Sequence, residues 1–130
     1  MREKKVRLLC SNVRGLICNW NIADSFDWRS YDVVAFNEVW QIRDFENIKK
    51  DGFAIKTCKL RANSRGGGSI IFVKTGLESK ELITPFNEGI IETTGIKIGK
   101  LNFINVYRPP SGSKDLFVDT LMQYLDTLGG

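Results

Sequence analysis

The chain has 130 residues, of which 42% are hydrophobic, and its formal net charge is +4. This length and composition indicate one globular domain over residues 1–130 and exclude a disordered tail. No apolar run reaches the roughly 18 residues that span a bilayer, and the apolar stretch near the start is too short for a secretion signal, so we expect a soluble nuclear or cytoplasmic protein with no membrane partner.

The first part of the chain is predicted to alternate short strands with polar connections. Residues 6–10 (VRLLC) favour a strand that ends in a polar turn at Ser11 and Asn12, and residues 19–28 favour a short helix. The next strand is residues 32–38. Because its apolar residues fall on both alternating faces, it should be covered from both sides. A helical turn is expected around residues 45–48.

The middle of the chain is predicted to be rich in strands. The candidates are residues 53–60, 69–73, the surroundings of 82–83, 89–98 and 101–107. A glycine-rich connection, RANSRGGG, joins the first two. Gly99 and Lys100 predict a tight hairpin between the last two, and Pro109 ends the final strand because proline cannot donate to the ladder.

The last element is an amphipathic helix over residues 114–128. Its apolar residues recur at helical spacing, Ser113 is the candidate N-cap, Asp115 lies in the first turn and Gly129 follows the end. A helix with one apolar face should pack on a sheet. The element order therefore predicts a mixed α/β fold with many antiparallel neighbours and helices outside a β core.

The residue types that most often carry catalysis are scarce. The chain has no histidine, which removes the commonest general base and transition-metal ligand. The three cysteines, Cys10, Cys18 and Cys58, lack CxxC spacing, so they support neither a disulfide framework nor a zinc site and are predicted to be buried. Catalysis would have to use carboxylates, tyrosine, lysine or a bound metal.

Polar residues follow three of the predicted strands. If those strands are neighbours in one sheet with their ends oriented alike, Asn12, Glu38 and Tyr107 converge on one edge. An amide and a carboxylate beside a phenol suit a hard cation such as Mg²⁺, with Mn²⁺ as the alternative, which would polarise a phosphoryl oxygen. The ordinary alternatives are a solvated strand-end glutamate, a strand-exit asparagine and a core or surface tyrosine.

Positive charge is concentrated in the middle of the chain. Between Asp51 and Glu78 there is no carboxylate, whereas five basic residues lie there: Lys56, Lys59, Arg61, Arg65 and Lys74. Such a basic field suits a polyanion such as DNA, although surface charge for solubility is the alternative.

Four arginines are candidate phosphate contacts, or else solvated surface charges: Arg14, Arg61, Arg65 and Arg108. The RGGG stretch that begins at Arg65 could present backbone N–H groups to a phosphate. It lacks the GxxxxGK[ST] and GxGxxG patterns, so the glycine-rich start of a strand is the alternative explanation.

Four stretches in this order carry a family resemblance: LLCSNVRGL, DVVAFNEVW, RGGGSIIFVK and LNFINVYRPPSG. Together they resemble the opening of the endonuclease/exonuclease/phosphatase superfamily, and most closely the endonuclease domain of LINE-type (non-LTR) retrotransposons. The resemblance implies a four-layer α/β sandwich, two sheets face to face with helices outside. It also implies Mg²⁺-dependent hydrolysis of DNA phosphodiester bonds, which in retrotransposons nicks the target to prime reverse transcription.

The same resemblance assigns roles to the strand-end residues. Glu38 matches the metal-binding glutamate, Asn12 the asparagine near the metal and the scissile phosphate, and Tyr107 the active-site tyrosine. One departure is Pro110, which stands where the nuclease and abasic-site branches have asparagine, and this form points to the retrotransposon branch.

A second departure is that the family's later motifs, Gly-Asp-x-Asn and a terminal Ser-Asp-His, have no counterpart in these residues. The aspartate and histidine of those motifs activate the attacking water and stabilise the transition state. Losing either group lowers the reaction rate by a factor of about 10² to 10⁴. We therefore expect the N-terminal part of a domain, truncated at its C-terminus and nearly inactive alone. Open sheet edges and an exposed apolar face should then favour self-association.

Two alternatives remain open at this stage. One is a noncatalytic nucleic-acid-binding remnant, which would use the basic residues between Asp51 and Glu78. The other is a phosphatase of the same superfamily, which the basic balance and the Tyr-Arg-Pro-Pro sequence disfavour.

Overall fold

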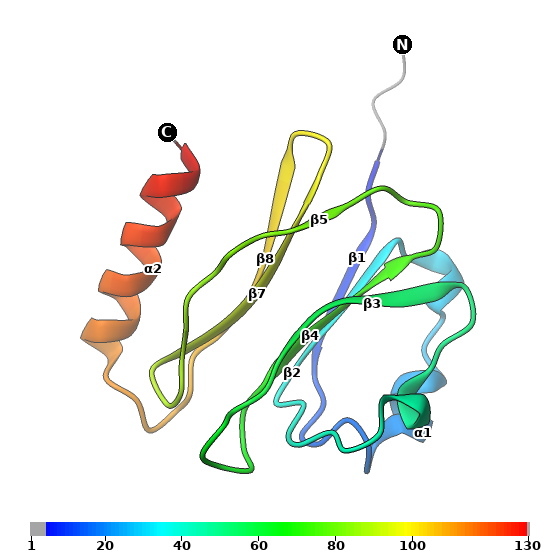
Figure 1. Ribbon diagram of the computed structural model, residues 1–130, viewed down its shortest axis with the longest axis horizontal. Helices are drawn as coiled ribbons and strands as arrows, with labels where there is room; N and C mark the ends of the chain where they lie inside the picture. The colour runs from blue at the N-terminus through cyan, green and yellow to red at the C-terminus, as the bar shows by residue number, and fades with distance from the viewer. Residues whose placement is uncertain (1–4, 130) are drawn as a thin grey trace.

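The computed structural model describes residues 5–129 and contains two β sheets with helices at their margins (Figure 1). The first sheet has the strand order β1 (Leu8–Asn12), β2 (Val33–Asn37), β4 (Ser69–Lys74), β3 (Phe53–Lys59). Strands β1 and β2 are parallel, whereas the other two pairs are antiparallel. The ends of β1 and β2 therefore lie at the same edge of this sheet.

The second sheet is built around β7 (Ile91–Ile98), which pairs with three antiparallel strands. Along one side it pairs with β8 (Leu101–Tyr107), and along the other with the short strands β5 (Lys80–Glu81) and β6 (Phe86–Asn87). The strand predicted around residues 82–83 is present only in its flanks, as β5 and β6, because residues 82 and 83 themselves lie between these two strands and Ile83 is 93% exposed. Pro85 has no N–H to continue the ladder, which explains the interruption.

Four helical segments complete the fold of residues 5–129. They are α1 (Trp20–Asp24), the 3₁₀ turns η1 (Trp28–Ser30) and η2 (Phe45–Ile48), and α2 (Lys114–Gly129). No helix within the described residues is long and apolar enough to cross a membrane. The fold is thus mixed α/β, with two sheets of mostly antiparallel strands and few helices, as expected.

Strand β2 is buried on both faces, which confirms its prediction. Val34 and Phe36 pack in a cluster with Trp28, whose ring meets that of Phe36 edge-on with centroids 5.9 Å apart. Val33 and Ala35 pack in a second cluster, which also contains β7 residues of the facing sheet. The two sheets therefore pack against each other, while the helical turns cover the outer face of the first sheet.

Helix α2 begins as the sequence predicts and lies beside the second sheet, in contact with β7 (Figure 1). Its N-terminus is capped by Ser113, whose Oγ accepts a hydrogen bond from the Leu116 N–H at 3.3 Å. Phe117, Leu121 and Tyr124 are half-buried. Four other apolar residues of the helix are exposed: Leu116, Val118, Met122 and Leu125.

The side of the two sheets formed by β1 and β8 is open within the described residues. Neither strand has a second partner there, and a cavity of about 190 Å³ opens between them. Leu8 and Leu101 are about half exposed on these strands. Cys10 is exposed too, as is Cys18, so the prediction that the cysteines are buried is wrong for both.

We expect the chain to self-associate through this open side. Unpaired strand edges are templates for pairing, and the accessible surface of 8341 Å² exceeds the roughly 7,000 Å² typical of a folded protein of this mass. Light scattering coupled to size-exclusion chromatography should show a dimer that grows with concentration. Lysine at Leu8 and Leu101 should return it to monomer. A wild-type monomer at every concentration contradicts this expectation.

Candidate active site between the two sheets

Glu38 lies one residue beyond β2 in a left-handed backbone conformation, with φ 54°. This conformation costs a residue with a side chain about 1–2 kcal/mol. Two neighbouring segments hold it in place. The Gly15 N–H donates to the Glu38 carbonyl at 2.7 Å, and the Trp40 N–H donates to the Gly67 carbonyl at 2.8 Å. The surrounding fold therefore maintains a strained position at a carboxylate.

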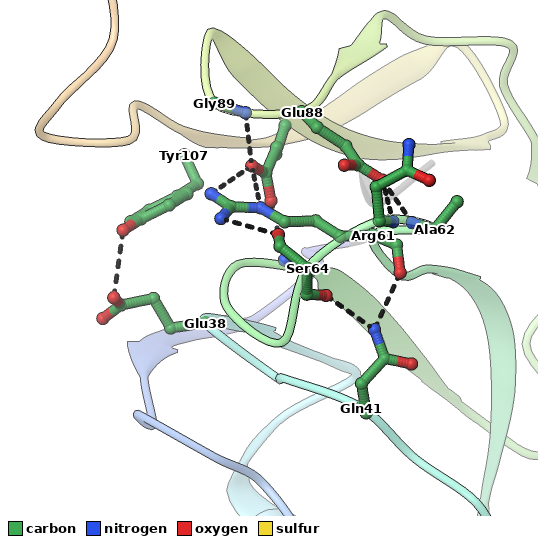
Figure 2. Close-up of polar contacts among 11 residues, drawn as sticks. Glu38, Gln41, Arg61, Ala62, Ser64, Glu88, Gly89 and Tyr107 are labelled. Carbon is green, nitrogen blue, oxygen red and sulfur yellow. Dashed lines mark hydrogen bonds and ion pairs between the residues drawn. The ribbon is translucent and has the colours of Figure 1, made fainter.

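The strained backbone determines where the Glu38 side chain points. The preceding residue, Asn37, faces the second sheet, where its Nδ2 donates to Asn105 Oδ1 at 3.0 Å. In a regular strand the next side chain would point to the opposite face. Glu38 instead also reaches the second sheet, where the Tyr107 hydroxyl of β8 donates to Glu38 Oε1 at 3.0 Å. Figure 2 shows these two side chains pointing toward each other.

The predicted convergence of three side chains is found for Glu38 and Tyr107 only, and in a different geometry from the one expected. β8 belongs to the second sheet, so the premise that all three strands are neighbours in one sheet is wrong. Tyr107 reaches Glu38 across the gap between the sheets. Asn12 pairs with Asn37 in the parallel register of β1 and β2. It is exposed and makes no side-chain hydrogen bond within residues 5–129. It thus shares this edge without a side-chain hydrogen bond to the other two within the described residues.

The oxygen atoms at this edge suit a hard cation. Within residues 5–129, Glu38 forms no salt bridge, and the only side-chain hydrogen bond that it accepts comes from Tyr107. Oε2 of Glu38 is therefore free. The Oδ1 atom of neighbouring Asn37 is buried without a hydrogen-bond partner. No cluster of three His, Cys, Asp or Glu side chains able to hold a metal occurs in the described part of the chain. Mg²⁺ can nevertheless bind through one carboxylate, waters and substrate phosphates.

Tyr107 is a neutral hydrogen-bond donor at physiological pH. Burial raises the pKa of its phenol to about 12, and the hydrogen bond to Glu38 and the charges of Glu38 and Glu92 act in the same direction. The positive charge of Arg61 opposes them. A neutral phenol bound to a carboxylate fixes that carboxylate without competing for a cation.

The raised pKa of Tyr107 predicts a specific alkaline transition in the metal-free chain. The stability that Tyr107 contributes should be complete below about pH 10 and be lost as the pH rises towards 12. Phenolate absorbance in the near ultraviolet measures this ionisation, and the Tyr107→Phe difference assigns it. Glu38→Gln should lower the pKa of Tyr107, because a negative charge is removed. An unchanged titration in Glu38→Gln would show that the two groups do not interact.

A second polar centre, which was not predicted from the sequence, lies beside Tyr107. Glu92 of β7 is fully buried, and its register partner across the ladder is Tyr107. Its Oε2 accepts from Arg61 Nε at 2.7 Å and lies 2.6 Å from Arg61 Nη2. The backbone N–H groups of Gly68 and Gly89 donate to its two oxygens at 2.7 and 3.2 Å. Four donor groups therefore surround one buried carboxylate.

The glycine-rich loop thus surrounds an internal anion. Gly67 has φ 64°, and a Cβ there would overlap the Glu92 carboxylate and the Arg61 side chain. Gln41 fixes the same loop, because its Nε2 donates to the carbonyls of Arg61 at 2.7 Å and Ser64 at 3.0 Å (Figure 2). This arrangement supports the glycine-rich start of a strand over a phosphate loop.

The basic residues proposed as phosphate contacts lie in different environments. Arg14, Arg65 and Arg108 are exposed. Arg61 is bound to Glu92, so its guanidinium holds the loop in place. Lys59 donates to the Thr84 carbonyl at 2.8 Å, and burial lowers the pKa of its amine. DNA contacts by the four arginines stay a prediction.

The end of the two sheets therefore has a defined chemistry. A strained, half-buried carboxylate accepts from a neutral phenol, and a buried ion pair next to the phenol holds a basic loop. Neither a protein-family model nor a curated protein sequence matches this chain.

Proposed function

We propose that this chain provides the Glu38 portion of a Mg²⁺-dependent site that hydrolyses phosphodiester bonds in DNA, as in target-site nicking by non-LTR retrotransposons. The observation that supports it most is the contact between Glu38 and Tyr107 across the two sheets. The strained backbone of Glu38 costs stability, and one of its carboxylate oxygens is left free, which a purely structural role does not require. Such strain is concentrated at functional sites.

The proposal extends to the fold family. The four sequence stretches resemble the endonuclease/exonuclease/phosphatase superfamily, whose four-layer sandwich places helices outside two facing sheets. In support, the two sheets share an apolar cluster, helical turns cover the first sheet, and α2 lies beside the second (Figure 1). We propose that this arrangement is the same sandwich.

The residues of the site have distinct tasks in this proposal. A bound Mg²⁺ held by Glu38, with Asn12 near it, would supply a Lewis acid for a phosphoryl oxygen. Tyr107 orients the Glu38 carboxylate with its single O–H, and when a cation binds that carboxylate the same O–H can donate to a phosphate oxygen instead. Exposed arginines such as Arg14 and Arg65 neutralise the flanking phosphates.

We further propose that residues 1–130 hydrolyse DNA very slowly when isolated. The chain has no histidine, and the described residues bring a single carboxylate to Tyr107 from the first sheet. A base that activates water and a group that stabilises the leaving oxygen would each raise the rate of hydrolysis by a factor of about 10² to 10⁴. Without them, positioning and charge neutralisation remain.

Metal uptake and nicking test the two parts of the proposal separately. Calorimetric titration of Mn²⁺ into the chain saturated with a short DNA oligonucleotide should detect one Mn²⁺-binding event beyond that of the oligonucleotide alone, which Glu38→Gln abolishes and Glu46→Gln, at an exposed carboxylate, preserves. Absence of uptake, or uptake indifferent to Glu38→Gln, would refute the metal site. In a plasmid assay with Mg²⁺ we expect no nicking above background. Robust nicking that Glu38→Ala removes would refute the proposed inactivity.

A noncatalytic DNA-binding role is the second candidate. It is favoured by the run without carboxylates between Asp51 and Glu78, which carries the exposed Lys56 and Arg65. DNA binding that weakens steeply with salt, together with no uptake of Mn²⁺ in the calorimetric titration, would support this role over the metal site.

A further inference from the structure

A cleft of about 760 Å³ opens beside the candidate active site. Its lining includes Gly15, Trp40, Gln41, Arg43, Asn47 and Arg65. The lining also includes Val39, which directly follows Glu38 in the chain, but neither Glu38 nor Tyr107. Its volume lies within the range typical of small-molecule pockets.

Trp40 is held in this cleft with unusual constraint. Its φ is 65°, its N–H donates to the Gly67 carbonyl at 2.8 Å, and its ring packs on Gly15, where a Cβ would lie 2.7 Å from Cε3. The side chain is nevertheless 36% exposed, whereas Trp28 in the core is 2% exposed. The fold therefore accepts backbone strain while leaving part of a large aromatic ring in solvent.

Two guanidinium groups share the cleft with this ring. Arg43 and Arg65 line it, and Arg65 is carried by the loop that Glu92 and Gln41 fix. Asp44 also lines the cleft, but its Oδ1 accepts from the Glu46 N–H at 3.0 Å and caps η2. The charge available to a ligand is therefore mainly positive.

We propose that this cleft binds an unstacked nucleotide of the DNA strand, with its base on the Trp40 ring and its phosphates near Arg65 and Arg43. An aromatic face beside arginines is the chemistry that binds single-stranded nucleic acid. A base inside a duplex has both faces covered, so the ligand must be single-stranded or flipped out. This inference rests on the proposed function, because it takes the DNA of that function as the ligand.

The competing explanation is that Trp40 only closes the packing over Gly15. In that case replacing Trp40 would change stability, and the loss of affinity would be the same for any polyanion. Stacking instead predicts a loss that depends on the presence of bases. The two explanations therefore differ in a measurable way.

Fluorescence anisotropy with labelled oligonucleotides, in EDTA, tests the stacking. We expect a thymidine oligonucleotide to bind about tenfold or more tightly than an abasic oligonucleotide of equal length. Trp40→Ala should remove this difference, and Trp40→Phe should retain part of it. Arg65→Ala should weaken the binding of both oligonucleotides. Arg29→Ala is the control and should weaken the binding of neither, because Arg29 is exposed in η1, which precedes the start of β2, whereas Glu38 follows its end.

Several results would overturn the proposal. Equal affinity of the wild type for the two oligonucleotides would do so, as would unchanged preference in a Trp40→Ala chain whose circular dichroism shows that it is folded. Tighter binding of the matching uridine oligoribonucleotide would overturn DNA as the ligand. Binding should persist in Glu38→Gln, so a failed metal site and a failed cleft give different results.

Discussion

Replacing Glu92 with alanine is expected to lower the free energy of unfolding by about 3 kcal/mol or more. The substitution leaves the Arg61 guanidinium, which is 16% exposed, without its counter-ion. It also removes the acceptor of the buried Gly68 N–H. Breaking a buried pair from one side is costly because the remaining charge and donors stay desolvated.

Urea and thermal unfolding measure this loss, which corresponds to a melting temperature lower by roughly 10 °C. Glu81→Ala, at an exposed carboxylate of β5, is the control and should change stability by less than about 0.5 kcal/mol. Removing both partners, in Glu92→Leu with Arg61→Met, should recover part of the loss. A loss below about 1 kcal/mol in Glu92→Ala would show that the pair does not stabilise the loop.

Replacing Gly67 with alanine is expected to be similarly destabilising, by about 3 kcal/mol. Its positive φ costs about 1–2 kcal/mol for a residue with a side chain, and the added Cβ would also displace the Glu92 carboxylate from Arg61. The same unfolding measurements apply. The altered loop should also lose its hydrogen bond from the Trp40 N–H and hence disturb the cleft.

Gly99 provides a matched control for this substitution. Its φ of 58° is close to the 64° of Gly67, but nothing lies within 4 Å of a Cβ added there. Gly99→Ala should therefore cost only the backbone strain, about 1–2 kcal/mol. Equal losses in the two variants would mean that Gly67 is needed for its backbone conformation alone.

Local patterns predicted most of the secondary structure. The apolar run of β2 identifies a strand buried on both faces, and Ser113 marks the start of α2, whose end at Gly129 lies one residue beyond the predicted one. The Gly99–Lys100 hairpin is also present, between β7 and β8. These features depend on neighbours within a few residues, which is why one sequence suffices to find them.

The arrangement of the candidate site depends on distant contacts. Tyr107 meets Glu38 from the facing sheet, and strand patterns do not specify which sheet a strand joins. Glu92 is buried because Arg61, 31 residues earlier, lies over it. A glutamate in an alternating strand carries no local sign of such a partner. One sequence feature did indicate an unusual loop here: Arg65 is followed by three consecutive glycines, which allow the left-handed conformation seen at Gly67 and Gly68.

The most direct test of the central claim is paramagnetic broadening by Mn²⁺ in the nuclear magnetic resonance spectrum of the ¹⁵N-labelled chain. At substoichiometric Mn²⁺ with a short DNA oligonucleotide, the amide signals of Glu38, Asn12 and Tyr107 should broaden first. Glu38→Gln should abolish this broadening. Signals around the exposed carboxylates Glu78 and Glu81 should stay sharp. Broadening confined to those surface carboxylates, or unchanged in Glu38→Gln, would contradict a divalent-cation site at the meeting of the two sheets.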